Sequence, residues 1–214
     1  TLGEKKFRNY LASLSLLKKI KGFKTVLPQD EYHYTLEICK FYKEFNIDMV
    51  FNVFSENSQK DWRRLFPLSN SGVQHYKSVL TGYASEPPTK MDDELFLPLK
   101  KNIDVGYRAR KLPYSLGRLG YYKWKISDVF LEKNKQIGLK MDVSNDSQNV
   151  IIGKNWNEFL KSCRTILGTE SGASIHDLDG EIEKNIMAYL IKNHNATYEE
   201  VESKFLMDEA IHIN

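Results

Sequence analysis

Apolar residues recur along the chain with two different periods, one typical of helices and the other of strands. A spacing of three or four residues predicts helices at residues 7–20, 35–45, 121–135, 156–163, 180–193 and 198–207, with a short helix around Trp62 and Leu65. Shorter apolar and β-branched runs predict strands at residues 23–28, 47–54, 76–80, 102–107, 139–143 and 165–168. This alternation of strands and helices indicates an α/β protein with parallel sheets.

A proline-rich, charged segment divides this pattern into two series. The adjacent prolines Pro87 and Pro88 forbid regular structure, and the charged residues after them keep the segment in water. We therefore predict a Rossmann-like region at residues 1–86, a linker at 87–100 and the start of a second Rossmann-like region at 101–214. In both regions helices flank parallel sheets, whose ligands bind at the carboxyl ends of the strands.

Composition narrows the class of protein further. With 41% hydrophobic and 12% aromatic residues, the 214-residue chain can build a buried core. No apolar run approaches the roughly 18 residues of a spanning helix, which excludes a transmembrane protein. A net charge of +3 is too small to indicate nucleic acid as the partner. Cys39 and Cys163 lack the spacing of a zinc site or a disulfide framework, so we expect two buried thiols.

The densest candidate site is the basic, glycine-containing segment at residues 104–123, which lies between a predicted strand and a predicted helix. Its glycines let the backbone approach a ligand, and its cations can neutralise a dianion next to a helix N-terminus. These cations are Arg108, Arg110, Arg118 and Lys123. The spacing matches neither a Walker motif nor GxGxxG, so it does not support ATP or NAD in their usual cradles. The alternative is a solvated basic loop.

Hydroxyls and carboxylates follow the predicted strand at residues 165–168. Thr169, Glu170 and Ser171 stand in a loop of small residues that suits a hydroxyl-rich ligand, with Glu170 as a base or as a partner of a sugar hydroxyl. The alternative is a helix cap beside a solvated carboxylate.

The next segment, residues 174–180 (SIHDLDG), combines a histidine with two aspartates. Such a set can bind a divalent metal, although it more often forms a turn into a helix.

A third group of polar residues follows the first predicted strand. Asp30, Glu31 and His33 supply two acids and an imidazole at its carboxyl end. They suit a polar ligand, and the alternative is an acidic cap on the N-terminus of the next helix.

Four segments of the chain, taken together and in this order, carry a resemblance to a known family. They are residues 23–34 (FKTVLPQDEYHY), 81–83 (TGY), 103–124 (IDVGYRARKLPYSLGRLGYYKW) and 163–180 (CRTILGTESGASIHDLDG). In this combination the chain resembles bacterial glycosyltransferases of GT-B architecture that belong to surface-polysaccharide clusters. The resemblance implies transfer of a sugar from a nucleotide-sugar donor to a saccharide or lipid-linked acceptor, with no metal or other cofactor. It also implies a cytoplasmic protein, with scope for peripheral association with the inner membrane.

The resemblance also implies roles for the candidate residues. Some GT-B enzymes open their second domain with a Gly-Arg turn and a nearby lysine against the donor diphosphate. By analogy, Arg118 would stabilise the charge of the leaving group. The full donor-side set is Arg108, Arg110, Gly117, Arg118, Gly120, Lys123, Thr169, Glu170 and Ser171. The acceptor-side set, which would supply the catalytic base, is Asp30, Glu31 and His33.

Some features depart from the family. The family has a tryptophan at Ser115, a Gln-Glu pair at Tyr121 and Tyr122, and an aromatic residue at His176, which argues against a metal at His176. The family pattern also continues beyond Asn214 into a segment whose carboxylate holds the donor. We therefore expect the chain to be a piece of a longer protein, which need not be active alone.

Two other classes of function fit the residues. A non-catalytic nucleotide- or sugar-binding α/β module would use the basic segment as an anion cradle. A metal-dependent phosphatase would use Asp30, Glu31 and Asp177.

Overall fold

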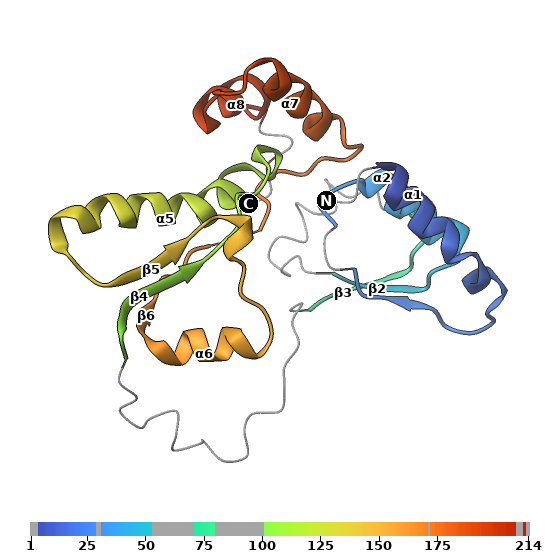
Figure 1. The fold of residues 1–214 in the computed structure, drawn as a ribbon. Coiled ribbons are helices and arrows are strands. Elements are labelled where there is room, and N and C mark those ends of the chain that lie inside the picture. Colours follow the sequence, from blue (N-terminus) through green and yellow to red (C-terminus); the bar gives the residue numbers. More distant parts are fainter. Residues whose placement is uncertain are drawn as a thin grey trace, which may run out of the picture. The chain divides into compact units, whose positions relative to one another are not determined.

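The structure is a computed structural model that describes residues 4–28, 31–52, 71–79, 101–170, 172–208 and 212. These residues form an α/β fold with two three-stranded parallel sheets and flanking helices (Figure 1). The predicted fold class is thereby confirmed. The chain divides into two compact units: unit 1 comprises residues 1–82 and 173–214, and unit 2 comprises residues 83–172.

The sheet of unit 1 has the strand order β1-β2-β3. Its strands are β1 (Thr25–Val26), β2 (Met49–Asn52) and β3 (His75–Ser78). Helix α1 (Glu4–Ser13) continues into a 3₁₀ helix, η1 (Ser15–Lys19), so the first predicted helix is divided in two. Helix α2 (Thr35–Glu44) joins β1 to β2.

The core of unit 1 forms where the apolar face of α2 meets β2. Ile38, Phe41 and Tyr42 recur at helical spacing and pack with Val50 and other buried apolar residues. Tyr34, just before α2, has a positive φ of 54° and sets the direction in which the helix leaves the preceding segment. The predicted burial of the two thiols, Cys39 and Cys163, is confirmed. Burial raises the pKa of Cys39 to about 12.

The sheet of unit 2 has the strand order β5-β4-β6. Its elements are β4 (Ile103–Arg108), a 3₁₀ turn η3 (Tyr114–Leu116), α5 (Gly117–Ile137), β5 (Met141–Ser144), η4 (Ser147–Asn149), α6 (Lys154–Ser162) and β6 (Cys163–Ile166). Helix α5 connects β4 to β5, which lies on one side of β4. Helix α6 then connects β5 to β6, which lies on the other side of β4. Helices α5 and α6 therefore lie on opposite faces of this sheet (Figure 1). The central strand β4 is the point at which the winding reverses, where α/β sheets bind ligands.

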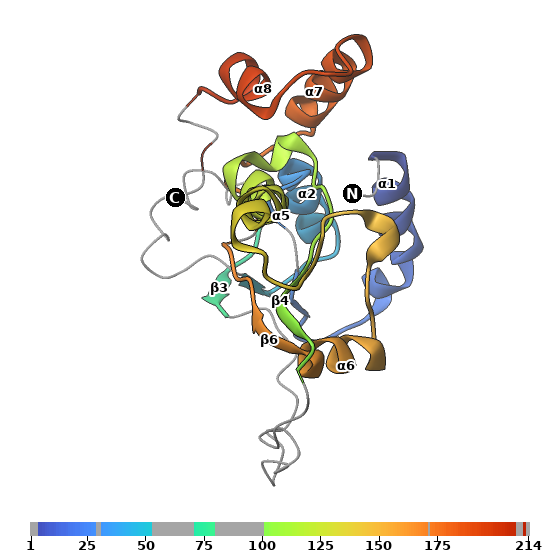
Figure 2. The same ribbon diagram turned by 60° about the vertical axis from the view of Figure 1, so that its left-hand side comes forward.

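The last described helices form a hairpin in unit 1. Helix α7 (Glu181–Lys192) lies beside α8 (Tyr198–Phe205) (Figures 1 and 2). The start of α8 carries a capping box in which Thr197 and Glu200 bond each other's backbone N–H groups. None of the helices in the described ranges has the length and apolar character needed to cross a membrane.

The division into units differs most from the expected domains in the last part of the chain. Residues 173–214 group with unit 1, whereas the sequence pattern assigns them to the second region. Backbone hydrogen bonds account for the difference. Tyr34 donates to the carbonyl of Asp177 (3.1 Å), and Asp177 donates to the carbonyl of Tyr32 (2.9 Å). The expected linker at 87–100 and the short helix near Trp62 lie outside the described residues.

Candidate functional site

A pocket of about 460 Å³ opens in unit 2 at the carboxyl end of β4; we call it the basic pocket. Its lining is Arg108, Ala109, Arg110, Lys123, Val150, Ile151, Ile152, Gly153 and Trp156. Strands β4 and β5 are adjacent and parallel, so the loops that follow them open at the same edge of the sheet. Three of the expected donor-side cations are thus brought together where a ligand is expected.

Arg108, the last residue of β4, is held firmly by its neighbours. Its guanidinium donates to the Asp142 carboxylate (2.6 Å) and to the backbone carbonyls of Asp142 (2.8 Å) and Tyr107 (2.9 Å). It also lies 4.6 Å from the centroid of the Phe159 ring. The positive charge of Arg108 is therefore already partly neutralised. Arg108 contributes mainly to the wall of the pocket and is less available to bind an anion.

Arg110 and Lys123 are the cations of the basic pocket that remain available. Arg110 is exposed and Lys123 is half-buried. Within the described ranges, neither side chain has an ion-pair partner. The Tyr107 hydroxyl donates to the carbonyl of Lys123 (2.7 Å) and so ties α5 to β4. Two positive charges on one pocket suit a dianion such as a phosphate or diphosphate.

An apolar wall faces these cations. Trp156 lies on the first turn of α6 with its ring 5.5 Å from that of Phe159, and Val150 and Ile152 are 46% and 76% exposed. The apolar spacing predicted Trp156 as part of the helix at residues 156–163, and neither Trp156 nor residues 150–153 were among the candidate site residues. The order of the elements could have indicated this wall. Residues 150–153 follow β5, the strand next to β4, and loops after adjacent parallel strands open at the same edge of the sheet.

The local fold accounts for the glycines of the basic segment. A Cβ at Gly106 would lie 2.4 Å from the Cys163 Sγ, so this glycine lets β4 pack against its neighbours. Gly117 begins α5 with φ 73° and ψ −159°, a conformation open essentially to glycine alone. A Cβ at Gly120 would lie 2.7 Å from the Cβ of Leu116. Each of these glycines therefore has a structural reason that needs no ligand.

Five of the remaining donor-side candidates are described and lie outside the lining of the basic pocket. Gly117, Arg118 and Gly120 form the first turn of α5. Thr169 and Glu170 follow β6, in a loop that begins where Leu167 donates to the carbonyl of Gly106 (3.1 Å). Ser171 lies outside the described residues.

A second group of polar residues is buried in unit 1; we call it the acid–imidazole cluster. Its members are Glu31, His33, Thr35, His176, Asp177 and Glu183. An isolated parallel bridge between His33 and Asp177 aligns the two segments that supply them. The structure therefore joins two candidate groups that lie far apart in the sequence.

The Asp177 carboxylate holds the N-terminus of α7. It accepts hydrogen bonds from the backbone N–H groups of Gly180 (3.0 Å), Ile182 (3.2 Å) and Glu183 (2.9 Å). This arrangement satisfies three of the otherwise unpaired donors of the first turn and places a negative charge at the positive end of the helix. Asp177 thus has a structural role in capping α7.

His176 is buried in a neutral state. Thr35 donates its hydroxyl proton to the Glu31 carbonyl (2.8 Å), so its oxygen accepts from the Nε2 of His176 (2.5 Å). The Nδ1 is therefore unprotonated, and among the described residues it has no hydrogen-bond partner. Burial lowers the pKa of His176 to about 4. In the described part of the chain, no group of three or more His, Cys, Asp or Glu side chains is arranged to hold a metal.

Glu31 is 1% exposed and carries a proton at neutral pH. Burial raises its pKa to about 8, against the lowering effect of the Tyr42 hydroxyl, which lies 3.3 Å from the Oε1. A protonated carboxyl cannot accept another proton, so Glu31 is poorly suited to act as a base at neutral pH.

His33 lies beside a carboxylate. Its Nδ1 is 3.6 Å from the Oε2 of Glu183, and its ring packs edge-on against Tyr32 and Tyr34 at centroid distances of 5.9 Å and 5.5 Å. A carboxylate at this position can stabilise a protonated imidazole. Asp30, the third acceptor-side candidate, lies outside the described residues.

Comparisons with protein-family models, with curated proteins and with solved structures find no match to this chain.

Proposed function

We propose that the chain is part of a bacterial glycosyltransferase of GT-B type. It would transfer a sugar from a nucleotide-sugar donor to a saccharide or lipid-linked acceptor in polysaccharide biosynthesis. The observation that carries the proposal is the basic pocket, where Arg110 and Lys123 meet Trp156 at the carboxyl end of a central parallel strand. The presence of two α/β units agrees with the resemblance.

The basic pocket suits the donor because its two walls differ in chemistry. Sugar transfer leaves a nucleoside diphosphate, on which negative charge develops as the glycosidic bond breaks. Arg110 and Lys123 would stabilise that charge through charge-assisted hydrogen bonds. The apolar wall of Val150, Ile152 and Trp156 would take a base or sugar face.

On the acceptor side, His33 is better suited than Glu31 to take the hydroxyl proton. Glu31 is already protonated at neutral pH, whereas His33 has a carboxylate 3.6 Å from its Nδ1. Glu183 would stabilise the imidazolium formed when His33 accepts a proton.

Calorimetric titration with UDP-, GDP- and CMP-sugars tests the donor site. Arg110→Ala and Lys123→Ala should each weaken binding at least about tenfold, because each removes a charge-assisted hydrogen bond. Lys133→Ala is the matched control, since Lys133 is an exposed lysine on the same helix as Lys123. Absence of binding to the full-length protein, or equal affinities for all variants, would contradict the proposal.

A second candidate is a non-catalytic nucleotide- or sugar-binding module. The burial of both described candidate bases favours it, because Glu31 is 1% exposed and His33 is 7% exposed. Product analysis with the full-length protein, a bound nucleotide-sugar and lipid-linked or saccharide acceptors separates the two. Donor binding without any transfer or hydrolysis supports the module and contradicts the transferase.

A further inference from the structure

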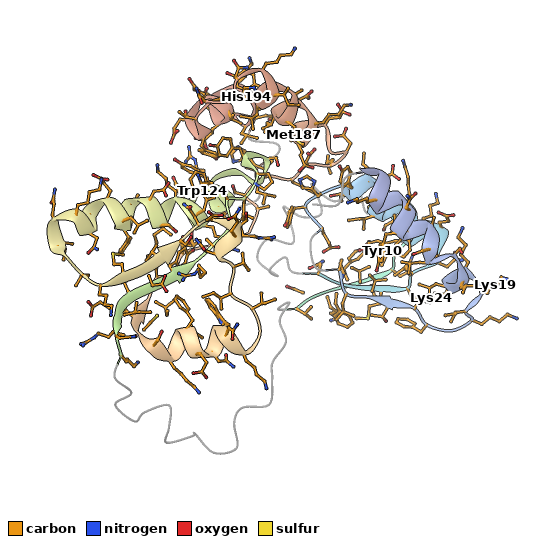
Figure 3. The ribbon with its side chains drawn as sticks, in the orientation of Figure 1. Tyr10, Lys19, Lys24, Trp124, Met187 and His194 are labelled. Atoms are coloured by element: carbon orange, nitrogen blue, oxygen red, sulfur yellow. The ribbon has the colours of Figure 1, made fainter. Side chains whose placement is uncertain are left out.

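Helix α5 has a second apolar face besides the one that packs within unit 2. Tyr121, Trp124 and Ser127 belong to the buried face, and Figure 3 labels Trp124 near the start of the helix. On the opposite side, apolar residues recur at a spacing that brings them onto one face of a helix. They are Tyr122, Ile126, Val129, Phe130 and Ile137. We call these five residues the outer stripe of α5.

The outer stripe is exposed along most of its length. The exposed fractions are 48% for Tyr122, 40% for Val129, 39% for Phe130 and 65% for Ile137, and Ile126 is half-buried. With the rise and turn of an α-helix, the stripe runs for about 22 Å and covers an arc of about 100°. An arc of this width is the face with which a helix packs against a neighbour, and contiguous exposed apolar surface marks an interaction site.

Two opposite charges lie along one edge of the outer stripe. Lys125 and Glu132 are seven residues apart, so two turns of the helix bring them to the same side. Lys125 has no ion-pair partner among the residues that the structure describes. Glu132 pairs with Lys135, and both side chains are 71% exposed. Such an exposed pair contributes little to stability, so the Glu132 carboxylate can take another partner.

This order of charges is self-complementary when two copies of α5 pack antiparallel. In an alignment centred between Asp128 and Val129, Lys125 of each copy faces Glu132 of the other, because the two residues lie at equal distances from the centre. A parallel alignment would instead bring Lys125 of one copy against Lys125 of the other. The charges therefore favour the antiparallel arrangement.

The same antiparallel alignment also joins the apolar residues of the two stripes. Ile126 and Val129 of both copies meet at the middle, and Tyr122 of each copy lies beside Ile137 of the other at the two ends. Lys133 is on this side of the helix too, and its methylene stem can pack along Tyr122 of the other copy while its ammonium stays in water. A lysine within such a seam fixes the register of the two helices.

We propose that two copies of the chain associate through the outer stripes of α5 as an antiparallel helix pair. Apolar contact along the stripes stabilises the dimer, and the two ion pairs between Lys125 and Glu132 set its direction. One helix from each copy makes a small interface, so the dimer is reversible, with a dissociation constant in the micromolar range. The self-complementary charges favour a second copy of the chain over a different partner.

Sedimentation velocity over a wide range of concentrations tests the proposal, and it should show a monomer that becomes a dimer as the concentration rises. Val129→Glu should raise the dissociation constant at least about tenfold, because it places a carboxylate in the apolar seam of both copies. Lys125→Glu and Glu132→Lys should each raise it about tenfold, since each turns both ion pairs into like-charge contacts.

A mixture of the two charge variants tests the pairing of the charges directly. The Lys125→Glu chain and the Glu132→Lys chain should bind each other about as tightly as the natural chain binds itself, because every charge in the mixed dimer again faces its opposite. Fluorescent labelling of one variant lets sedimentation velocity detect the mixed dimer. A mixture that stays monomeric would overturn the proposal.

Matched controls lie on α7, where Ile191 is 68% exposed and Lys192 is also exposed. Ile191→Glu and Lys192→Glu should leave the dissociation constant unchanged, and circular dichroism should show that all variants keep the fold. A monomer at every concentration, or a dimer that Val129→Glu leaves intact, would also contradict the proposed pairing. The assay contains no nucleotide and none of the substituted residues lines the basic pocket, so its outcome is independent of the proposed function.

Discussion

The hydroxyl of Thr35 accepts a hydrogen bond of 2.5 Å from the Nε2 of His176, although 141 positions separate the two residues in the chain. The same hydroxyl donates to the carbonyl of Glu31. One buried oxygen thus joins the segment before α2 to the segment before α7. It also fixes the tautomer of His176, because the only proton of the hydroxyl is already used.

Replacement of Thr35 by valine should destabilise unit 1 by about 2 kcal/mol, because it leaves the buried N–H of His176 and the Glu31 carbonyl without this partner. Urea unfolding followed by circular dichroism measures the loss. Thr25→Val is the control, since Thr25 is exposed on β1. Equal free energies of unfolding for the two variants would show that the hydroxyl does not join the segments.

Asp177→Asn should also lower the free energy of unfolding by about 2 kcal/mol, since it weakens three hydrogen bonds to backbone N–H groups and removes the charge at the N-terminus of α7. The neighbouring Asp179 is exposed and accepts one such bond, from Glu181 (3.1 Å). Asp179→Asn should therefore cost less than about 1 kcal/mol in the same urea titration. The reverse order would contradict the capping role of Asp177.

The raised pKa of Glu31 predicts a loss of stability with rising pH. Its pKa goes from 4.5 to about 8 on folding, so the folded state retains a proton that the unfolded state has released. The stabilising effect is complete below about pH 4.5 and declines by up to about 1.4 kcal/mol per pH unit until pH 8. Glu31→Gln should remove this decline. Unfolding of both proteins at several pH values measures the difference, and parallel curves would count against a protonated Glu31.

His176 should act in the opposite direction. Its pKa falls from 6.5 to about 4 on folding, so the unfolded state takes up a proton first as the pH is lowered. Relative to His176→Gln, the natural chain should lose stability as the pH falls from 6.5 to 4, by up to about 1.4 kcal/mol per pH unit. The same titration series provides the measurement. A difference that stays constant across this range would refute a neutral, buried His176.

Gly106→Ala should destabilise unit 2 by about 2 kcal/mol, because the added Cβ would lie 2.4 Å from the Cys163 Sγ and 2.9 Å from the Phe159 ring. Gly168→Ala is the matched control, since no atom lies within 4 Å of a Cβ at that position. Thermal unfolding of the two variants compares them. A stable Gly106→Ala variant would mean that β4 does not pack this closely.

Local sequence patterns predicted many of the helices and strands. The run at residues 102–107 predicts the central strand β4, which is buried on both faces at residues 105–107. The period of residues 180–193 predicts α7, because this helix buries one face and so imposes its spacing on the sequence. The end of α1 at Ser13 was not predicted. The apolar period continues to Ile20, but the segment after Leu14 stays exposed and forms a 3₁₀ turn.

The candidate sites were predictable only in part. The basic segment supplied Arg108, Arg110 and Lys123, but its pattern could not tell which charge is already paired, since Asp142 stands on another strand. Trp156 was predicted only as part of a helix, and its spacing gave no sign that it lines the basic pocket. Pockets form between segments that are distant in the chain, so a single segment predicts the cations but not the wall that faces them.

By itself, the sequence determined the α/β class, the order of most strands and helices, and the position of the basic segment at the end of a strand. These features depend on spacing within a few residues, which local burial and backbone geometry control. Only the tertiary structure decided that residues 173–214 belong with unit 1 and that His176 meets Thr35. Hydrogen bonds and burial between distant segments decide such pairings, and they also set the pKa values of Glu31 and His176. Contacts of this kind produce no periodic pattern in the sequence from which they could be predicted.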